Sequence, residues 1–162
     1  MKQLFLLTAL LMLLVAGCGG APSLDEPPQI AYGEQECDHC RMLISDARYA
    51  AAYMTEAGEA RRFDDIGDML LYHSEHEEDV YLFWVHDFDS KTWVKADEAF
   101  FVVSDAITSP MGHGIAAHNS REAAEAMATS LDGSVVTFAQ LMDQAKAGEL
   151  APAHQSEHNH SG

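Results

Sequence analysis

The chain has 162 residues, 48% of them hydrophobic and 22% charged, with 26 acidic side chains against 9 lysines and arginines. This length suits one domain or two very small ones, and this composition excludes a chain that is disordered or of low complexity throughout. The formal net charge of −17 makes nucleic acid a poor partner, because so acidic a surface repels phosphate groups. The charge fits an exported protein or one that gathers cations.

The first 17 residues have the pattern of an export signal. Lys2 precedes an apolar run of about a dozen residues, shorter than the roughly 20 that a spanning helix needs. The run ends in Val15-Ala16-Gly17-Cys18, which resembles a bacterial lipobox, in which the cysteine is lipidated. We therefore expect a lipoprotein signal peptide at 1–17 and lipid on Cys18, with a secretory peptide cut elsewhere as the alternative. Gly19 after the cysteine favours anchoring to the outer membrane, facing the periplasm.

Two polar segments flank the part of the chain that is expected to fold. Residues 18–28 are predicted to be a flexible tether, because they are mostly Gly, Ala, Pro, Ser, Asp and Glu. Residues 151–162 are predicted to be a disordered tail with three histidines, a pattern that can collect metal ions or arise by chance. These histidines are His154, His158 and His160.

The first half of the body, residues 29–95, is predicted to form a strand–strand–helix–strand unit. The segments 42–47 and 49–54 have the residue types of short strands, with 61–63 continuing the sheet. Asp64-Asp65 precede a run with helical spacing and are predicted to cap that helix rather than to act as a catalytic carboxylate pair. The segment 80–85 is rich in β-branched and aromatic residues, as strands are.

The second half, residues 96–150, repeats this order after roughly sixty residues, which suggests an internal duplication. Strands are predicted at 100–106, 115–118 and 135–137, with one helix capped by Asn119-Ser120 and a last helix at 138–146. The fold class expected is therefore α+β, with two similar small ββαβ units packed together, after the signal peptide and tether.

A short segment with two cysteines is the first candidate for chemistry. It reads Cys37-Asp38-His39-Cys40-Arg41-Met42 and combines two thiols, an imidazole and a thioether. Thiolate and thioether ligands select Cu(I) over hard divalent ions. A structural disulfide and a thiol-redox motif are the alternatives, although nearby acidic residues would raise the thiol pKa values. A closed all-cysteine zinc site is excluded within one chain, because there is no second pair.

The loop around Pro110-Met111-Gly112 is the second candidate. A large apolar methionine is out of place in a tight loop of Pro and Gly, unless it is buried or binds a ligand. His113 adds a second potential metal ligand, while a methionine that fills a gap in the core is the alternative. If the duplication holds, this loop corresponds to the 45–49 turn of the first unit and could lie near Cys40.

Six fragments follow one another along the chain: Cys-x-x-Cys-x-Met at 37–42, Phe-Asp-Asp-Ile-Gly-Asp-Met-Leu at 63–70, Val-His-Asp-Phe at 85–88, Trp93, Ala-Phe-Phe-Val-Val at 99–103 and Pro-Met-Gly at 110–112. Their order resembles the NosL family, the copper-chaperone lipoproteins associated with nitrous oxide reductase maturation. The resemblance runs from Cys18 to about Leu141. It implies two related ββαβ units, Cu(I) binding, and delivery toward the copper centres of periplasmic nitrous oxide reductase with a membrane transporter complex as partner.

The resemblance also implies which residues bind the metal. Cys40, Met42 and Met111 match the Cu(I) ligands of the family. Cys37, which some members lack, and His39 and His113, chosen on local grounds, are further candidates. Arg41 stands at a place where glycine is common in the family.

We therefore expect a membrane-anchored periplasmic Cu(I) chaperone that is not an enzyme. The chain has no glycine-rich phosphate loop, nucleophile elbow or His-Glu-x-x-His helix. Two alternatives stay open: a thiol–disulfide redox protein that uses Cys37 and Cys40, and a general periplasmic metal scavenger that uses the histidine tail.

Overall fold

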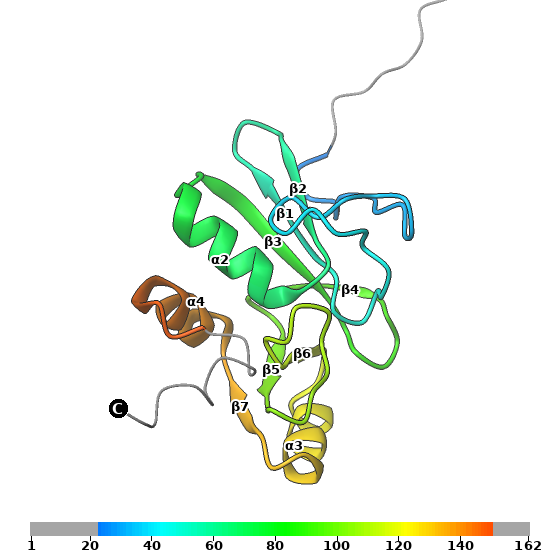
Figure 1. Ribbon diagram of the computed structural model, residues 1–162, viewed down its shortest axis with the longest axis vertical. Helices are drawn as coiled ribbons and strands as arrows, with labels where there is room; N and C mark the ends of the chain where they lie inside the picture. The colour runs from blue at the N-terminus through cyan, green and yellow to red at the C-terminus, as the bar shows by residue number, and fades with distance from the viewer. Residues whose placement is uncertain (1–22, 151–162) are drawn as a thin grey trace, which may run out of the picture.

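The computed structural model describes residues 23–150, which form two small antiparallel sheets and three helices (Figure 1). The first sheet has the order β2-β1-β3-β4, with β1 at Ala51–Thr55, β2 at Ala60–Phe63, β3 at Val80–His86 and β4 at Trp93–Lys95. The second has the order β6-β5-β7, with β5 at Phe100–Val103, β6 at Ile115–His118 and β7 at Ser134–Val136. The helices are α2 at Ile66–His76, α3 at Arg121–Ser130 and α4 at Phe138–Ala147. The α+β class and the two ββαβ units are confirmed, with β4 added to the first unit.

Some predictions fall on residues that the structure does not describe. The signal peptide, the lipidated Cys18 and the histidine tail lie outside the described residues. The described part of the expected tether contacts the first sheet: Pro28 is buried, and the Tyr81 hydroxyl donates a 2.9 Å hydrogen bond to Asp25. Packing therefore begins before residue 29. Within 23–150, none of the helices is both long enough and apolar enough to cross a membrane.

The helices begin where the sequence predicts, because each has a capping side chain. Asp65 accepts a 2.8 Å hydrogen bond from the Gly67 N–H and caps α2. Ser120 caps α3 in the same way through the Ala123 N–H, and Thr137 caps α4 in a capping box with Gln140. A capping side chain lies within three residues of the N–H group from which it accepts a hydrogen bond. The helix starts could therefore be predicted from the local sequence.

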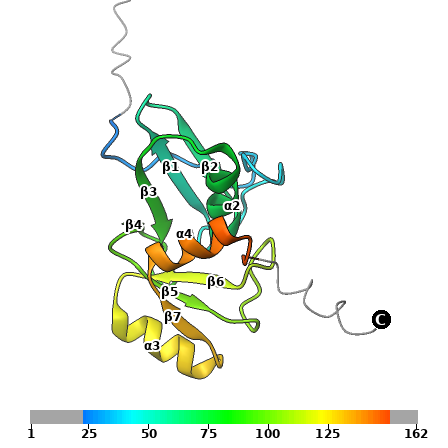
Figure 2. The same ribbon diagram turned by 90° about the vertical axis from the view of Figure 1, so that its left-hand side faces the viewer.

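The two units share one hydrophobic core. It includes Tyr53 and Met69 from the first unit and Phe101 and Leu141 from the second, all fully buried. Figure 2 shows α4 lying between α2 and the second sheet, where it closes this core. Successive residues of a strand point to opposite faces, so Val102 packs instead against α3 in a smaller cluster. The second sheet is therefore covered on both faces, which fixes the position of its loops relative to the first unit.

The prediction of a strand at 42–47 is wrong. Leu43 makes only an isolated bridge with Glu36, and Met42 and Leu43 are 54% and 51% exposed. An apolar run forms a strand only where a neighbouring strand can pair with it, and here only Ile44 reaches the core while the backbone makes no ladder with another strand.

The structure therefore changes which segments of the first unit are equivalent to those of the second. β1 lies between β2 and β3, as β5 lies between β6 and β7. The connection from β5 to β6, which carries Met111, therefore corresponds to the turn at 56–59 and not to the predicted turn at 45–49.

Candidate metal centre

The Cys-x-x-Cys segment forms a tight turn held by its own backbone. The Cys37 N–H donates a 2.8 Å hydrogen bond to the Met42 carbonyl, and the Arg41 N–H donates at 3.1 Å to the Cys37 carbonyl. Asp38 fastens the turn to β2, because its carboxylate accepts from the Arg62 N–H at 2.7 Å and its own N–H donates to the Arg62 carbonyl at 2.8 Å. The two cysteine side chains are thus presented together by a rigid turn.

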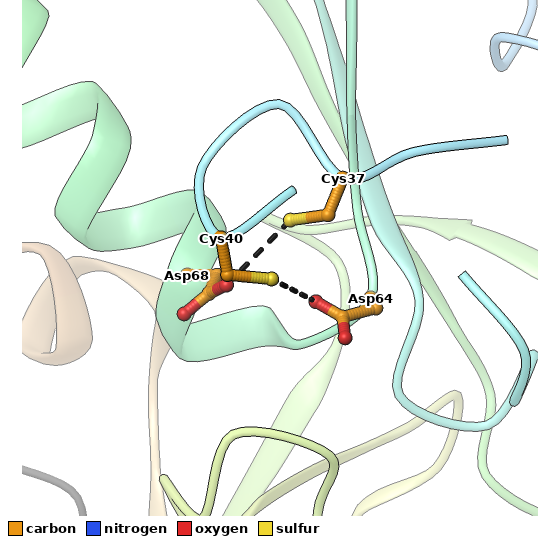
Figure 3. A group of neighbouring side chains, drawn as sticks. All are labelled: Cys37, Cys40, Asp64 and Asp68. Carbon is orange, nitrogen blue, oxygen red and sulfur yellow. Dashed lines mark hydrogen bonds between the residues drawn. The ribbon is translucent and has the colours of Figure 1, made fainter. Parts of the chain in front are cut away.

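Both thiols face carboxylates at the start of α2 (Figure 3). The Cys40 thiol donates to Asp64 Oδ1 at 3.3 Å, and the Cys37 thiol donates to Asp68 Oδ2 at 3.5 Å. One potential ligand atom from each of the four residues lies within 4.8 Å of all the others. Cys37 and both aspartates are buried, whereas Cys40 is half-buried, and both cysteines are free.

The Met111 loop of the second unit reaches the same turn of α2. The buried Asp65 carboxylate accepts hydrogen bonds from the Ser109 hydroxyl at 2.6 Å and from the Met111 N–H at 3.0 Å. His113 Nε2 lies 3.3 Å from Asp68 Oδ1. The loop therefore contacts the helix turn that also carries the partners of the two thiols, in agreement with the expectation that it lies near Cys40.

The residues predicted to bind metal differ in their burial and in their contacts with this turn. His39 Nδ1 lies 3.3 Å from Asp68 Oδ1, so His39 and His113 approach the same carboxylate oxygen. Met111 is half-buried, and Met42 is 54% exposed, at the surface next to the cysteines. The structure thus brings the side chains of Cys37, Cys40, His39 and His113 and the backbone of Met111 to the start of α2, and leaves the Met42 side chain at the surface.

Sequence reasoning missed Asp64 and Asp68 as partners of the thiols. Three aspartates within five residues, at 64, 65 and 68, were visible, but acidic residues at a helix start are common because they favour the helix dipole. Only Asp65 serves as the cap. Asp64 instead accepts from the Cys40 thiol, a contact that no local pattern encodes.

Burial dominates the electrostatics of the two thiols. It raises the pKa of both Cys37 and Cys40, although backbone N–H groups around Cys37, including those of His39 and Asp64, act in the opposite direction. Both side chains therefore stay protonated near neutral pH until a metal displaces the proton. A thiol with a raised pKa is a slow nucleophile, which disfavours the thiol-redox alternative.

The pKa values of the two buried carboxylates Asp65 and Asp68 shift in opposite directions. Burial raises the pKa of Asp65, although hydrogen bonds from Ser109 and Met111 oppose it. Burial also works against ionisation of Asp68, but hydrogen bonds from His113 and a neighbouring thiol outweigh it and lower the pKa. In His113 the same contact with Asp68 overcomes burial and raises the pKa of the imidazole.

Comparisons with known proteins identify the family. The model of the NosL family matches residues 29–146. The chain belongs to the NosL family. A relative from Stutzerimonas stutzeri, named copper-binding lipoprotein NosL, is 28% identical over 170 residues, which cover 96% of this chain and 88% of the relative.

The NosL fold is also found among solved structures. The crystal structure of the copper chaperone NosL from Shewanella denitrificans matches with a TM-score of 0.63 and 22% identity, over 74% of this chain and 96% of that one. Both relatives are named as copper-binding or copper-chaperone proteins and neither as an enzyme, in agreement with the prediction of a copper-binding protein that is not an enzyme.

Arg41 departs from the glycine expected in NosL proteins, and its backbone explains that glycine. Its φ of 66° lies in the left-handed region, which costs a residue other than glycine about 1 kcal/mol. We expect Arg41→Gly to raise the free energy of unfolding by roughly 0.5 kcal/mol, because the greater freedom of glycine in the unfolded chain offsets part of the relief. Urea denaturation measures this change.

Lys91 offers a matched control for this substitution. It has a φ of 57° in the turn between β3 and β4. Lys91→Gly should give a similar gain in stability without altering metal binding. A loss of stability in Arg41→Gly alone would contradict the explanation from backbone strain.

Proposed function

We propose that this NosL protein is a membrane-anchored periplasmic chaperone that binds Cu(I) and delivers it for assembly of the copper centres of nitrous oxide reductase. The observation that carries this proposal is the meeting of the Cys-x-x-Cys-x-Met turn and the Pro-Met-Gly loop at the first turn of α2. Cys40, Met42 and Met111 are the proposed ligands. The lipobox at Cys18 and the lipoprotein name of the relative from Stutzerimonas stutzeri support lipid anchoring.

The chemistry of these ligands suits an ion that must be held and then released. One thiolate and two thioethers are soft ligands that favour Cu(I). Cys40 is half-buried, and Met42 and Leu43 beside it are exposed, so an acceptor can approach the copper and replace its ligands one at a time. The acceptor proposed here is nitrous oxide reductase or its membrane transporter complex.

Titration with Cu(I) under anaerobic, reducing conditions against a chromogenic competitor tests the binding site. We expect one tight equivalent in the full-length protein. Cys40→Ala and Met111→Ala should each weaken the affinity by more than about a hundredfold, because each removes a ligand rather than an outer contact. Met127→Ala in α3 should bind as the wild type does, because Met127 packs in the small core cluster under the second sheet.

Several outcomes would count against the proposal. Equal affinity in all three variants would reject this set of ligands. Loss of tight binding after replacement of His154, His158 and His160 by alanine would favour the scavenger alternative. Survival of a reversible dithiol–disulfide couple with partner-reducing activity, in the absence of metal, would favour the redox alternative.

Delivery needs a separate test in cells. In a bacterium that lacks this chain and makes nitrous oxide reductase, we expect the purified enzyme to contain less copper. Wild-type protein should restore the copper content, and Cys40→Ala should not. Full restoration by Cys40→Ala would contradict copper delivery through this site.

A further inference from the structure

The side chain of His118, at the end of β6, is buried with an incomplete set of hydrogen bonds. It is only 1% exposed. Its Nε2 lies 3.3 Å from the sulfur of Met127 in α3, and its Nδ1 lies 3.6 Å from Asp89 Oδ2, beyond hydrogen-bond distance. Among residues 23–150, Nδ1 has no hydrogen-bond partner. A buried polar atom in this state costs free energy unless a bound ligand or ion satisfies it.

Neither neutral tautomer of His118 satisfies both ring nitrogens, because a neutral imidazole has one N–H and one lone pair. With the proton on Nε2, the ring donates to sulfur, a weak acceptor, and the lone pair of Nδ1 faces the carboxylate of Asp89. With the proton on Nδ1, the lone pair of Nε2 faces the lone pairs of the Met127 sulfur. A metal ion between Nε2 and sulfur removes this conflict, because both atoms then donate lone pairs to the ion.

The distance between the two atoms suits a shared metal ion. Metal ions such as zinc bind imidazole nitrogen at about 2.0 Å and sulfur at about 2.3 Å, so tetrahedral to trigonal angles place the two atoms about 3.5 to 3.7 Å apart. The observed 3.3 Å needs only a small adjustment. His118, Met127 and Asp89 line one pocket of about 460 Å³, and Asp89 is 70% exposed, so an ion can enter from solvent.

This pocket is separate from the proposed copper site. The Met111 loop precedes the first residue of β6, and His118 is the last residue of that strand. Because a strand advances about 3.3 Å per residue, the backbones of His113 and His118 are on the order of 15 Å apart. Figures 1 and 2 both show α3, which carries Met127, at the end of the molecule opposite the first sheet. The two sites therefore share no ligand.

We propose that His118 Nε2 and Met127 Sδ form a second site for Cu(I), with Asp89 as the residue that orients His118. Imidazole and thioether both bind copper, and a thioether disfavours hard divalent ions. A proton on Nδ1 directed at Asp89 leaves Nε2 free for the metal, as in carboxylate–histidine–metal triads. With two neutral ligands and no thiolate, this site binds Cu(I) more weakly and exchanges it faster than the proposed Cys40 site. It stands on its own geometry and not on the proposed function.

Methyl NMR during a titration with Cu(I) tests the site, because each methionine has its own ε-methyl signal. The full-length protein is used with His154, His158 and His160 replaced by alanine, so that the tail cannot take up the ion. Under anaerobic, reducing conditions we expect the Met127 signal to shift with a second equivalent, after the first has bound. A tight chromogenic competitor strips copper from so weak a site, so a competition titration still reports one equivalent.

Matched variants separate ligand loss from altered packing. Met127→Leu keeps the volume of the side chain but removes its sulfur, so the second equivalent should be lost. Met142→Leu changes another partly buried methionine, one that packs against the main core, and should keep the second equivalent. Asp89→Asn should weaken the second equivalent by about tenfold, because the orienting carboxylate is gone. Circular dichroism checks that each variant is folded.

The Cys40→Ala variant distinguishes failure of this inference from failure of the proposed function. In that variant we expect the Met127 signal to shift with the first Cu(I) added. A Met127 signal that never shifts would overturn the second site and leave the contact with His118 as an N–H···S hydrogen bond only. A second equivalent that survives in folded Met127→Leu would also overturn it. Neither result bears on the first equivalent, which is followed through the signals of Met42 and Met111.

Discussion

Asp65→Ala is expected to lower the free energy of unfolding by about 3 kcal/mol, because it removes a helix cap and leaves the donors of Ser109 and Met111 without their partner. Asp65 is fully buried and accepts hydrogen bonds from Gly67 in its own helix and from Ser109 and Met111 in the second unit. Loss of the carboxylate should also release the Met111 loop and weaken Cu(I) binding. Urea denaturation measures the first effect and competitive titration the second.

Two other substitutions separate the contributions of Asp65. Ser120→Ala removes the cap of α3, where the side chain accepts only from the Ala123 N–H of its own helix, and should cost only about 1 kcal/mol. Asp65→Asn keeps a good capping group but cannot accept from all three donors, so it should have an intermediate effect on stability and still weaken Cu(I) binding. If Asp65→Ala were no more damaging than Ser120→Ala, Asp65 would not be the link between the two units.

Gly67→Ala is expected to destabilise the protein by about 2 kcal/mol, although alanine is the better residue in a helix by about 1 kcal/mol. A Cβ atom at Gly67 would lie 2.6 Å from His113 Cβ and would overlap the imidazole ring. The helix and the Met111 loop would have to separate, so Cu(I) affinity should fall together with stability. Urea denaturation and competitive Cu(I) titration of the variant provide the two measurements.

A double-mutant cycle isolates the steric cause. In a His113→Gly background both the ring and the Cβ atom are gone, and Gly67→Ala should then be neutral or stabilising because only the helix preference remains. The difference between the two backgrounds measures the contact between α2 and the loop. An equal cost in both backgrounds would show that the glycine is required for another reason.

These two positions explain how a site can be built across two similar units. Asp65 and Gly67 lie at the start of α2. Asp65 accepts a hydrogen bond from the loop that carries Met111, and Gly67 lies against His113 of the same loop. The same turn carries Asp64 and Asp68, which face the cysteines. The first turn of α2 therefore sets the distance between the two ligand-bearing loops, and changes there should alter metal binding without removing a ligand.

Features set by neighbouring residues could be predicted from the sequence. The caps at Asp65 and Ser120, the three helices and the strands β3, β5 and β6 follow from capping side chains and periodicity within a few residues. The segment 42–47 shows the limit of this reasoning, because whether an apolar run becomes a strand depends on a partner that lies elsewhere in the chain.

The sequence by itself determined the α+β class, the two ββαβ units and the resemblance to NosL proteins, because these depend on local patterns and on the order of short motifs. Only the tertiary structure decided that the thiols of Cys37 and Cys40 face Asp68 and Asp64, and that Asp65 holds the Met111 loop. These contacts join residues 24 to 46 positions apart. These contacts form because both sheets share one core, closed by α4, which fixes the positions of the loops relative to one another.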